Sequence, residues 1–314
     1  MWRPNNLKIV FMGTPDFAVA SLEACLVNHD VVAVFTQPDK PKGRGKKMAP
    51  PAVKVKAEEH GIEVYQPLKL KTQENVDLLR SLAPDLIVVV AYGQILSKEI
   101  LDIPPKGCIN VHASLLPKFR GASPINWAIV QGEKVTGVTT MYMDVGLDTG
   151  DMIEKVEVDI TPEMNAGELH DILMSKGGDV LKSTLTLIDE DLAPRTVQED
   201  SLSSYAPLLD KTTGIIDWSN NVQNIVDQIR GLNPWPVAVT SFEGNKMKIF
   251  SAVPGENVTK GQLGEILEVN KSGLYVQAKD GIVNVQVLQF PNSKRMHISQ
   301  YILGHEVPCG IILG

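Results

Sequence analysis

The first half of the chain alternates short, continuously apolar segments with segments of helical periodicity. The apolar segments cover residues 8–12, 31–35, 63–65, 86–90 and 108–112. Between them, residues 16–28, 50–60 and 74–82 carry apolar side chains three or four positions apart, which is typical of amphipathic helices. A strand that is apolar at every position is buried on both faces, as in a parallel sheet covered by helices. The pattern therefore predicts an α/β domain with a doubly wound, mostly parallel, Rossmann-like sheet.

Beyond Asp148 the pattern changes. Residues 166–187 form one long amphipathic pattern, and the polar, Ser- and Pro-containing stretch 192–208 is typical of a linker. A helix is expected at 221–230, followed by strand-like runs at 237–242, 246–250, 263–269, 274–277 and 282–287. Short strands separated by Gly or Asn turns predict a small antiparallel, OB-like β-barrel. We therefore expect a first domain at 1–191, a linker at 192–208 and a barrel domain at 209–314.

Composition excludes several classes of protein. The longest apolar run, residues 86–92, has seven residues where a membrane span needs about 20, and the N-terminus has no apolar signal core. The three cysteines form no C-x-x-C pair, which favours a reducing compartment. We therefore expect a cytoplasmic protein with no membrane partner. The net charge of −7 means that a polyanionic partner would need a local basic patch.

Asn110 and His112 lie two positions apart on one predicted strand, so their side chains point to the same side. They stand at its carboxyl end, where open α/β sheets place ligands. Further along, Gly146 and Gly150 bracket Asp148. In one arrangement, Asp148 orients and stabilises a charged His112 while Asn110 donates a hydrogen bond to a developing oxyanion. From spacing alone, a structural role for His112 and a turn role for Asp148 are the more frequent alternatives.

Three longer motifs carry a resemblance to a known family. Residues 107–117, 120–124 and 137–151 closely resemble the formyltransferases that use 10-formyltetrahydrofolate. The resemblance implies that Asn110, His112 and Asp148 are catalytic. It also implies a folate cleft at the carboxyl edge of the sheet, without a metal. The residues expected to border that cleft are Val90, Tyr92, Ser114, Leu115, Leu116, Pro117 and Gly146.

Further motifs at residues 11–17, 36–40 and 233–236 are similar to the members of this family that formylate initiator methionyl-tRNA for translation initiation. The same branch carries a basic insertion, which here spans residues 39–48. Its five basic side chains are those of Lys40, Lys42, Arg44, Lys46 and Lys47. An isolated basic run is usually a solvated, mobile loop, but on an acidic chain this one can neutralise several phosphates. The resemblance implies that these residues bind tRNA, that Arg44 enters the acceptor stem, and that the barrel touches the tRNA of a monomeric enzyme.

Two alternatives remain once glycinamide ribonucleotide formyltransferase is set aside. A glycinamide ribonucleotide formyltransferase has a glycine-rich phosphate loop after its first strand, whereas this chain has Gly13-Thr14-Pro15-Asp16. A formyltransferase acting on nucleotide-linked amino sugars would share the catalytic set and typically lack the basic insertion. A non-enzymatic RNA-binding module would use the insertion alone, and it would leave Asn110 and His112 unexplained.

Overall fold

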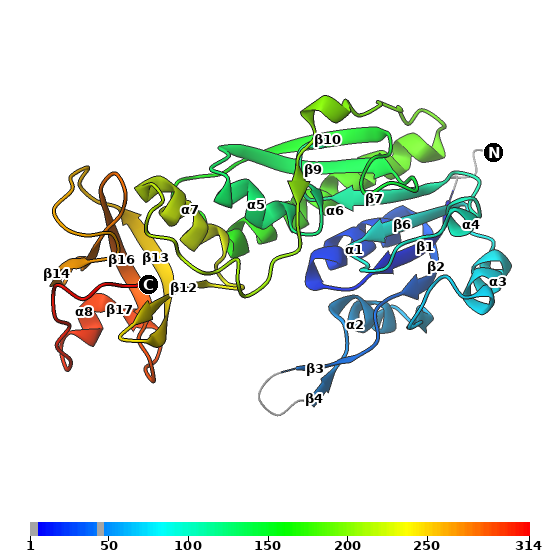
Figure 1. The fold of residues 1–314 in the computed structure, drawn as a ribbon. Coiled ribbons are helices and arrows are strands. Elements are labelled where there is room, and N and C mark those ends of the chain that lie inside the picture. Colours follow the sequence, from blue (N-terminus) through cyan, green and yellow to red (C-terminus); the bar gives the residue numbers. More distant parts are fainter. Residues whose placement is uncertain (1–5, 43–46) are drawn as a thin grey trace. The chain divides into compact units, whose positions relative to one another are not determined.

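The computed structural model describes residues 6–42 and 47–314. They form two compact units, each built from several stretches of the chain (Figure 1). The first unit draws on residues up to 121 and on 136–158 and 170–205, and the second on 122–135, 159–169 and 206–314. The boundaries expected at 191 and 208 follow the sequence rather than this spatial division, so they stay a prediction.

A seven-stranded sheet forms the centre of the first unit, in the order β10-β9-β7-β6-β1-β2-β5. Its strands are β1 (Lys8–Gly13), β2 (Asp30–Phe35), β5 (Val64–Tyr65), β6 (Leu86–Val90), β7 (Cys108–His112), β9 (Val135–Tyr142) and β10 (Met152–Asp159). The pairs from β5 to β7 are parallel, and β9 runs antiparallel to β7. The doubly wound, mostly parallel sheet is confirmed. The strands β9 and β10 were not among the expected ones.

Helices cover both faces of this sheet. They are the 3-10 turn η1 (Asp16–Ala18) and the helices α1 (Val19–Asn28), α2 (Ala52–Glu59), α3 (Gln73–Leu82), α4 (Lys98–Leu101) and α6 (Ala166–Asp189). On one face, Leu79 of α3 and Ile100 of α4 share a buried cluster with Cys108 of β7. On the other, a Cβ at Gly177 of α6 would lie 3.3 Å from Val111. Alternation along β7 therefore places Asn110 and His112 on the side of Cys108.

The described ends of the basic insertion pair as two short strands, which we call the basic hairpin. Strands β3 (Lys40–Lys42) and β4 (Lys47–Ala49) pair antiparallel, with Lys42 opposite Lys47. The remaining short elements are β8 (Arg120–Gly121), η2 (Asp200–Leu202) and β11 (Tyr205–Ala206). Within the described part of the chain, no helix has the length and apolarity needed to cross a membrane.

The second unit combines helices with an antiparallel sheet. Its helices are α5 (Pro124–Val130), α7 (Val222–Gly231) and α8 (Ile298–Tyr301). The sheet order is β12-β13-β16-β15-β14, with β17 beside β16. The strands are β12 (Ala238–Phe242), β13 (Asn245–Pro254), β14 (Ile266–Asn270), β15 (Gly273–Gln277), β16 (Ile282–Gln289) and β17 (Met296–His297). Trp218, Ile225 and Ile249 share its buried core, and the expected antiparallel β domain is confirmed.

Candidate active site

Hydrogen bonds tie together three loops at the carboxyl edge of the parallel sheet. The Thr14 hydroxyl, after β1, donates to the carbonyl oxygen of Tyr92, after β6, at 2.9 Å. From the loop after β2, the Gln37 amide donates to the same carbonyl at 3.3 Å, and its backbone N–H donates to the Thr14 hydroxyl. This is the edge where α/β sheets bind ligands, and β7 brings Asn110 and His112 to it.

The imidazole of His112 is held at both nitrogens. The side chain is 6% exposed, and Nε2 lies 2.9 Å from the carbonyl oxygen of Phe119. A carbonyl oxygen only accepts, so Nε2 carries a proton and donates it there. The other nitrogen, Nδ1, faces Oδ2 of Asp148 at 3.7 Å. The Asp148 carboxylate therefore stands opposite the second ring nitrogen of His112.

Asp148 reaches His112 because its loop has an unusual backbone. Its φ of +53° lies in the left-handed region, and Oδ2 accepts a hydrogen bond from the backbone N–H of Gly121 at 2.8 Å. At Gly150 a Cβ would overlap the carbonyl oxygen of Tyr142, so that position requires glycine. The structure thus brings His112 and Asp148 together as predicted. Asn110 stands half-buried on the same side of β7.

The turn at residues 114–117 is fixed to β9 and β10. The Thr139 hydroxyl donates to the carbonyl oxygen of Ser114 at 2.7 Å and accepts from the backbone N–H of Leu116 at 3.1 Å. The Lys155 ammonium donates to the carbonyl oxygen of Leu116, and burial lowers the pKa of this lysine. Ser114 and Leu116 are buried, whereas Leu115 and Pro117 remain half-exposed.

The other residues expected to border a folate also include both buried and exposed positions. Val90 and Tyr92 are buried, and Tyr92 packs in the core with Leu96 and Ile100. That burial raises the pKa of the Tyr92 hydroxyl. Gly146 is exposed in the loop that carries Asp148. The buried residues among those expected to border the folate pack beneath the carboxyl edge of the sheet. Contact of any of these residues with a folate stays a prediction.

The basic hairpin is anchored at its base by a polar network. Asp39, directly before β3, accepts hydrogen bonds from Lys54 Nζ at 3.0 Å and from Gln66 Nε2 at 2.8 Å. These hydrogen bonds, that from Gln66 first, lower the pKa of Asp39. Lys40 and Lys47 are exposed on the hairpin. The expected tRNA-binding residues Arg44 and Lys46 lie outside the described residues.

Comparison with known proteins extends over both units. The formyl transferase family model matches residues 7–185, and the model of the formyl transferase C-terminal domain matches 208–306. Methionyl-tRNA formyltransferase of Acetivibrio thermocellus is 53% identical over 310 residues, which cover 98% of this chain and 100% of that protein. The enzyme of the same name from Clostridioides difficile is 52% identical over the same shares of both chains. The chain belongs to the methionyl-tRNA formyltransferase family. It is therefore an enzyme of a formyl-transferring family.

Solved structures of lower identity share the fold. The N-formyltransferase of Helicobacter canadensis, in complex with folinic acid and dTDP-3-aminofucose, has a TM-score of 0.66 at 22% identity. The match covers 89% of this chain and 99% of that one. HypX from Aquifex aeolicus matches 95% of this chain and 47% of its own, with a TM-score of 0.63 at 17% identity. These likenesses concern the fold alone.

Sequence reasoning missed two residues beside the loop that carries Asp148. Gln198 is 7% exposed and hydrogen-bonds to the backbone on both sides of Thr149. Arg120 donates from Nε to the Gln198 amide oxygen at 3.0 Å. Gln198 lies in the polar stretch 192–208 that predicts a linker. Its burial could not be predicted, because hydrophobic periodicity does not identify a single buried polar side chain. Arg120 stands within a family motif, which was the one available signal.

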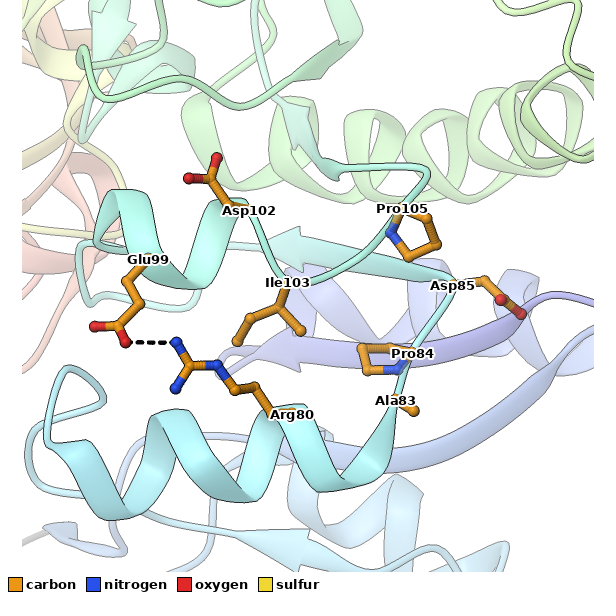
Figure 2. Close-up of a pocket in the computed structure, with 8 residues that line it drawn as sticks. All are labelled: Arg80, Ala83, Pro84, Asp85, Glu99, Asp102, Ile103 and Pro105. Carbon is orange, nitrogen blue, oxygen red and sulfur yellow. Dashed lines mark hydrogen bonds and ion pairs between the residues drawn. The ribbon is translucent and has the colours of Figure 1, made fainter.

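A hollow of about 570 Å³ lies at the opposite, amino-terminal edge of the sheet (Figure 2). Figure 2 shows Arg80 turned toward Glu99, and their atoms lie 2.6 Å apart. A second guanidinium nitrogen of Arg80, Nη1, lies 3.1 Å from Oδ1 of Asp77. The other acids that line the hollow have partners too, since Asp102 pairs with Lys98 and Asp85 accepts a hydrogen bond from the backbone N–H of Lys8. Among the residues that the structure describes, no cluster of three His, Cys, Asp or Glu side chains is arranged to hold a metal.

Proposed function

We propose that this enzyme transfers the formyl group of 10-formyltetrahydrofolate to the α-amino group of methionine on initiator methionyl-tRNA. The pairing of His112 Nδ1 with Asp148 at the carboxyl edge of the sheet is the observation that supports the reaction. The acceptor is supported by relatives named methionyl-tRNA formyltransferase, which match the chain over 98% of its length.

The reaction asks two things of the site. The amine must attack as the neutral base, which is accessible near neutrality because α-amino groups titrate at about 7.7–8.0. Its attack on the formyl carbon forms a tetrahedral oxyanion, which Asn110 and a protonated His112 stabilise with hydrogen bonds. Asp148, held by the Gly121 N–H, keeps His112 charged. When the C–N10 bond breaks, the proton lost by the amine passes to N10 through Asp148 or a site water.

The two substrates are assigned to different parts of the chain. The folate lies at the carboxyl edge, between the strand end at Val90 and Tyr92, the turn at 114–117 and the loop of Gly146. A folate as formyl donor is supported by the match of the formyl transferase family model to residues 7–185. Lys40, Lys42, Arg44, Lys46 and Lys47 hold the acceptor stem, and the C-terminal β domain touches the same tRNA. The proposal places a monomeric enzyme in the cytoplasm, with neither a metal nor a membrane partner.

The choice of acceptor tests the proposal. We expect formyl transfer from labelled 10-formyltetrahydrofolate to initiator methionyl-tRNA. A nucleotide-linked amino sugar should accept the label no faster than a free amino acid does. Turnover with the amino sugar and none with methionyl-tRNA would identify the chain as a small-molecule formyltransferase that keeps the same catalytic groups.

The anchor of the basic hairpin gives a second prediction. Lys54→Met removes the ammonium that donates hydrogen bonds to the Asp39 carboxylate. Because the base of the hairpin is then less fixed, we expect about a tenfold lower kcat/KM for initiator methionyl-tRNA, equivalent to ~1.4 kcal/mol. Lys56→Met on the same helix is the matched control, since Lys56 pairs with Glu23 and Glu59 instead. Equal effects of the two changes would mean that the Asp39 network does not position the hairpin.

A further inference from the structure

The side-chain amide of Gln198 has one possible orientation. Its Nε2 donates to the carbonyl oxygens of Asp148 and Gly150, both at 2.8 Å. Its Oε1 accepts from Nε of Arg120 at 3.0 Å. Carbonyl oxygens only accept and a guanidinium only donates, so every contact fixes the same placement of nitrogen and oxygen. The side chain is 7% exposed, and a buried network that is satisfied in this way is rigid.

One arm of Gln198 holds the backbone of the loop that carries Asp148. The two carbonyl groups it binds flank Thr149, and Asp148 itself has a φ of +53°. A residue other than glycine persists in this left-handed conformation when its surroundings enforce it. The double hydrogen bond from Gln198 is such an enforcement. Without it, the loop is free to relax toward more ordinary backbone angles and to carry the Asp148 carboxylate with it.

The amide oxygen of Gln198 contacts Arg120, which precedes the residue that donates a hydrogen bond to the Asp148 carboxylate. Arg120 contacts Gln198 through Nε and Asp200 Oδ1 through Nη2, the latter at 2.7 Å. The next residue, Gly121, donates its backbone N–H to Asp148 Oδ2 at 2.8 Å. Gln198 therefore links the backbone of Asp148 to the segment that binds its side chain. The Gln198 amide therefore contacts both the loop that carries Asp148 and the segment that donates a hydrogen bond to its carboxylate.

We infer that Gln198 is a positioning residue that sets the Asp148 carboxylate opposite Nδ1 of His112. The inference rests on the proposed function, in which that carboxylate keeps His112 charged. Gln198 acts through Asp148 and does not itself touch the substrates. Its loss slows the chemical step and leaves folate and tRNA binding nearly unchanged.

The first test separates turnover from binding. Gln198→Met keeps the length of the side chain and removes the hydrogen bonds that its amide makes to Arg120, Asp148 and Gly150. We expect kcat to fall about 10- to 100-fold, because displacing a catalytic group by about 1 Å can cost a factor of 10². KM for both substrates should stay within about threefold. Gln73→Met, an exposed position on α3, is the matched control and should leave both constants unchanged. A rise in KM at constant kcat would overturn the inference.

A double-mutant cycle with Asp148→Asn decides whether Gln198 works through Asp148. In the Asp148→Asn background, Gln198→Met should lower kcat by no more than about twofold. An undiminished loss there, or full activity of Gln198→Met alone, contradicts the inference while leaving the proposed function intact. Wild-type turnover by Asp148→Asn alone contradicts the proposed site itself. Should Gln198→Met fail to fold, Arg120→Met enters the same cycle, because it removes the donor to the Gln198 amide oxygen and leaves Gln198 in place.

Discussion

We expect His112→Ala to lower the rate of formyl transfer about 10²- to 10³-fold while the chain stays folded, with effects of the same order for Asn110→Ala and Asp148→Asn. Each change removes a group that stabilises the oxyanion or the charge on the imidazole, and one such donor is typically worth this factor in rate. Asp148→Asn keeps an oxygen for the Gly121 N–H and loses only the charge. Single-turnover rates with initiator methionyl-tRNA measure the effect on the chemical step.

The three effects should be smaller in combination than the product of the single losses, because the residues act as a unit. His112→Ala also leaves the carbonyl oxygen of Phe119 without its donor, at a cost of about 1–3 kcal/mol in stability. Rates are therefore compared well below the unfolding temperature, with His60→Ala at an exposed histidine as the control. A folded His112→Ala enzyme with near-normal turnover would remove His112 from the mechanism.

Arg44→Leu should lower kcat/KM for initiator methionyl-tRNA about 10- to 100-fold and reduce the preference over the elongator species. A guanidinium offers a planar fork and a stacking face to unpaired bases, whereas a lysine offers a point charge. A base-reading arginine is worth about 1–3 kcal/mol, and a phosphate-binding lysine weakens all tRNAs alike. Arg44→Lys should also be impaired, because the charge survives and the fork does not.

Lys42→Ala is the matched comparison within the same basic insertion. It should weaken binding modestly and reduce the slope of log kcat/KM against log salt by about one unit. The assays therefore run at several salt concentrations with both methionyl-tRNAs. If Arg44→Leu behaves like Lys42→Ala and leaves the initiator preference unchanged, the hairpin is a general electrostatic tether and discrimination lies elsewhere.

The parallel strands could be predicted because they are apolar on both faces. Val88 and Ile109 sit in the sheet with helices on either side, so neither position carries a polar residue. Strand β9 escaped prediction for the opposite reason. Thr139 and Thr140 are polar by type and fully buried. Their hydroxyls are satisfied by Ser114 and Thr184 across the fold, which hydrophobic periodicity cannot reveal.

The candidate site was predictable only in part. Alternation along β7 places Asn110 and His112 on one side, and family motifs point to Asp148. The left-handed backbone of Asp148 and the hydrogen bond from Gly121 depend on tertiary contacts that spacing does not encode. Gln198 depends on such contacts entirely, since its partners are backbone carbonyls far away in the sequence.

The most direct measurement is formyl transfer from labelled 10-formyltetrahydrofolate to initiator and elongator methionyl-tRNA, assayed side by side with the same preparation. The account predicts rapid labelling of the α-amino group of methionine on the initiator species and much slower labelling of the elongator species. Equal rates would contradict the assigned role of the basic hairpin in choosing the substrate. Labelling of neither tRNA by the folded protein would contradict the proposed function.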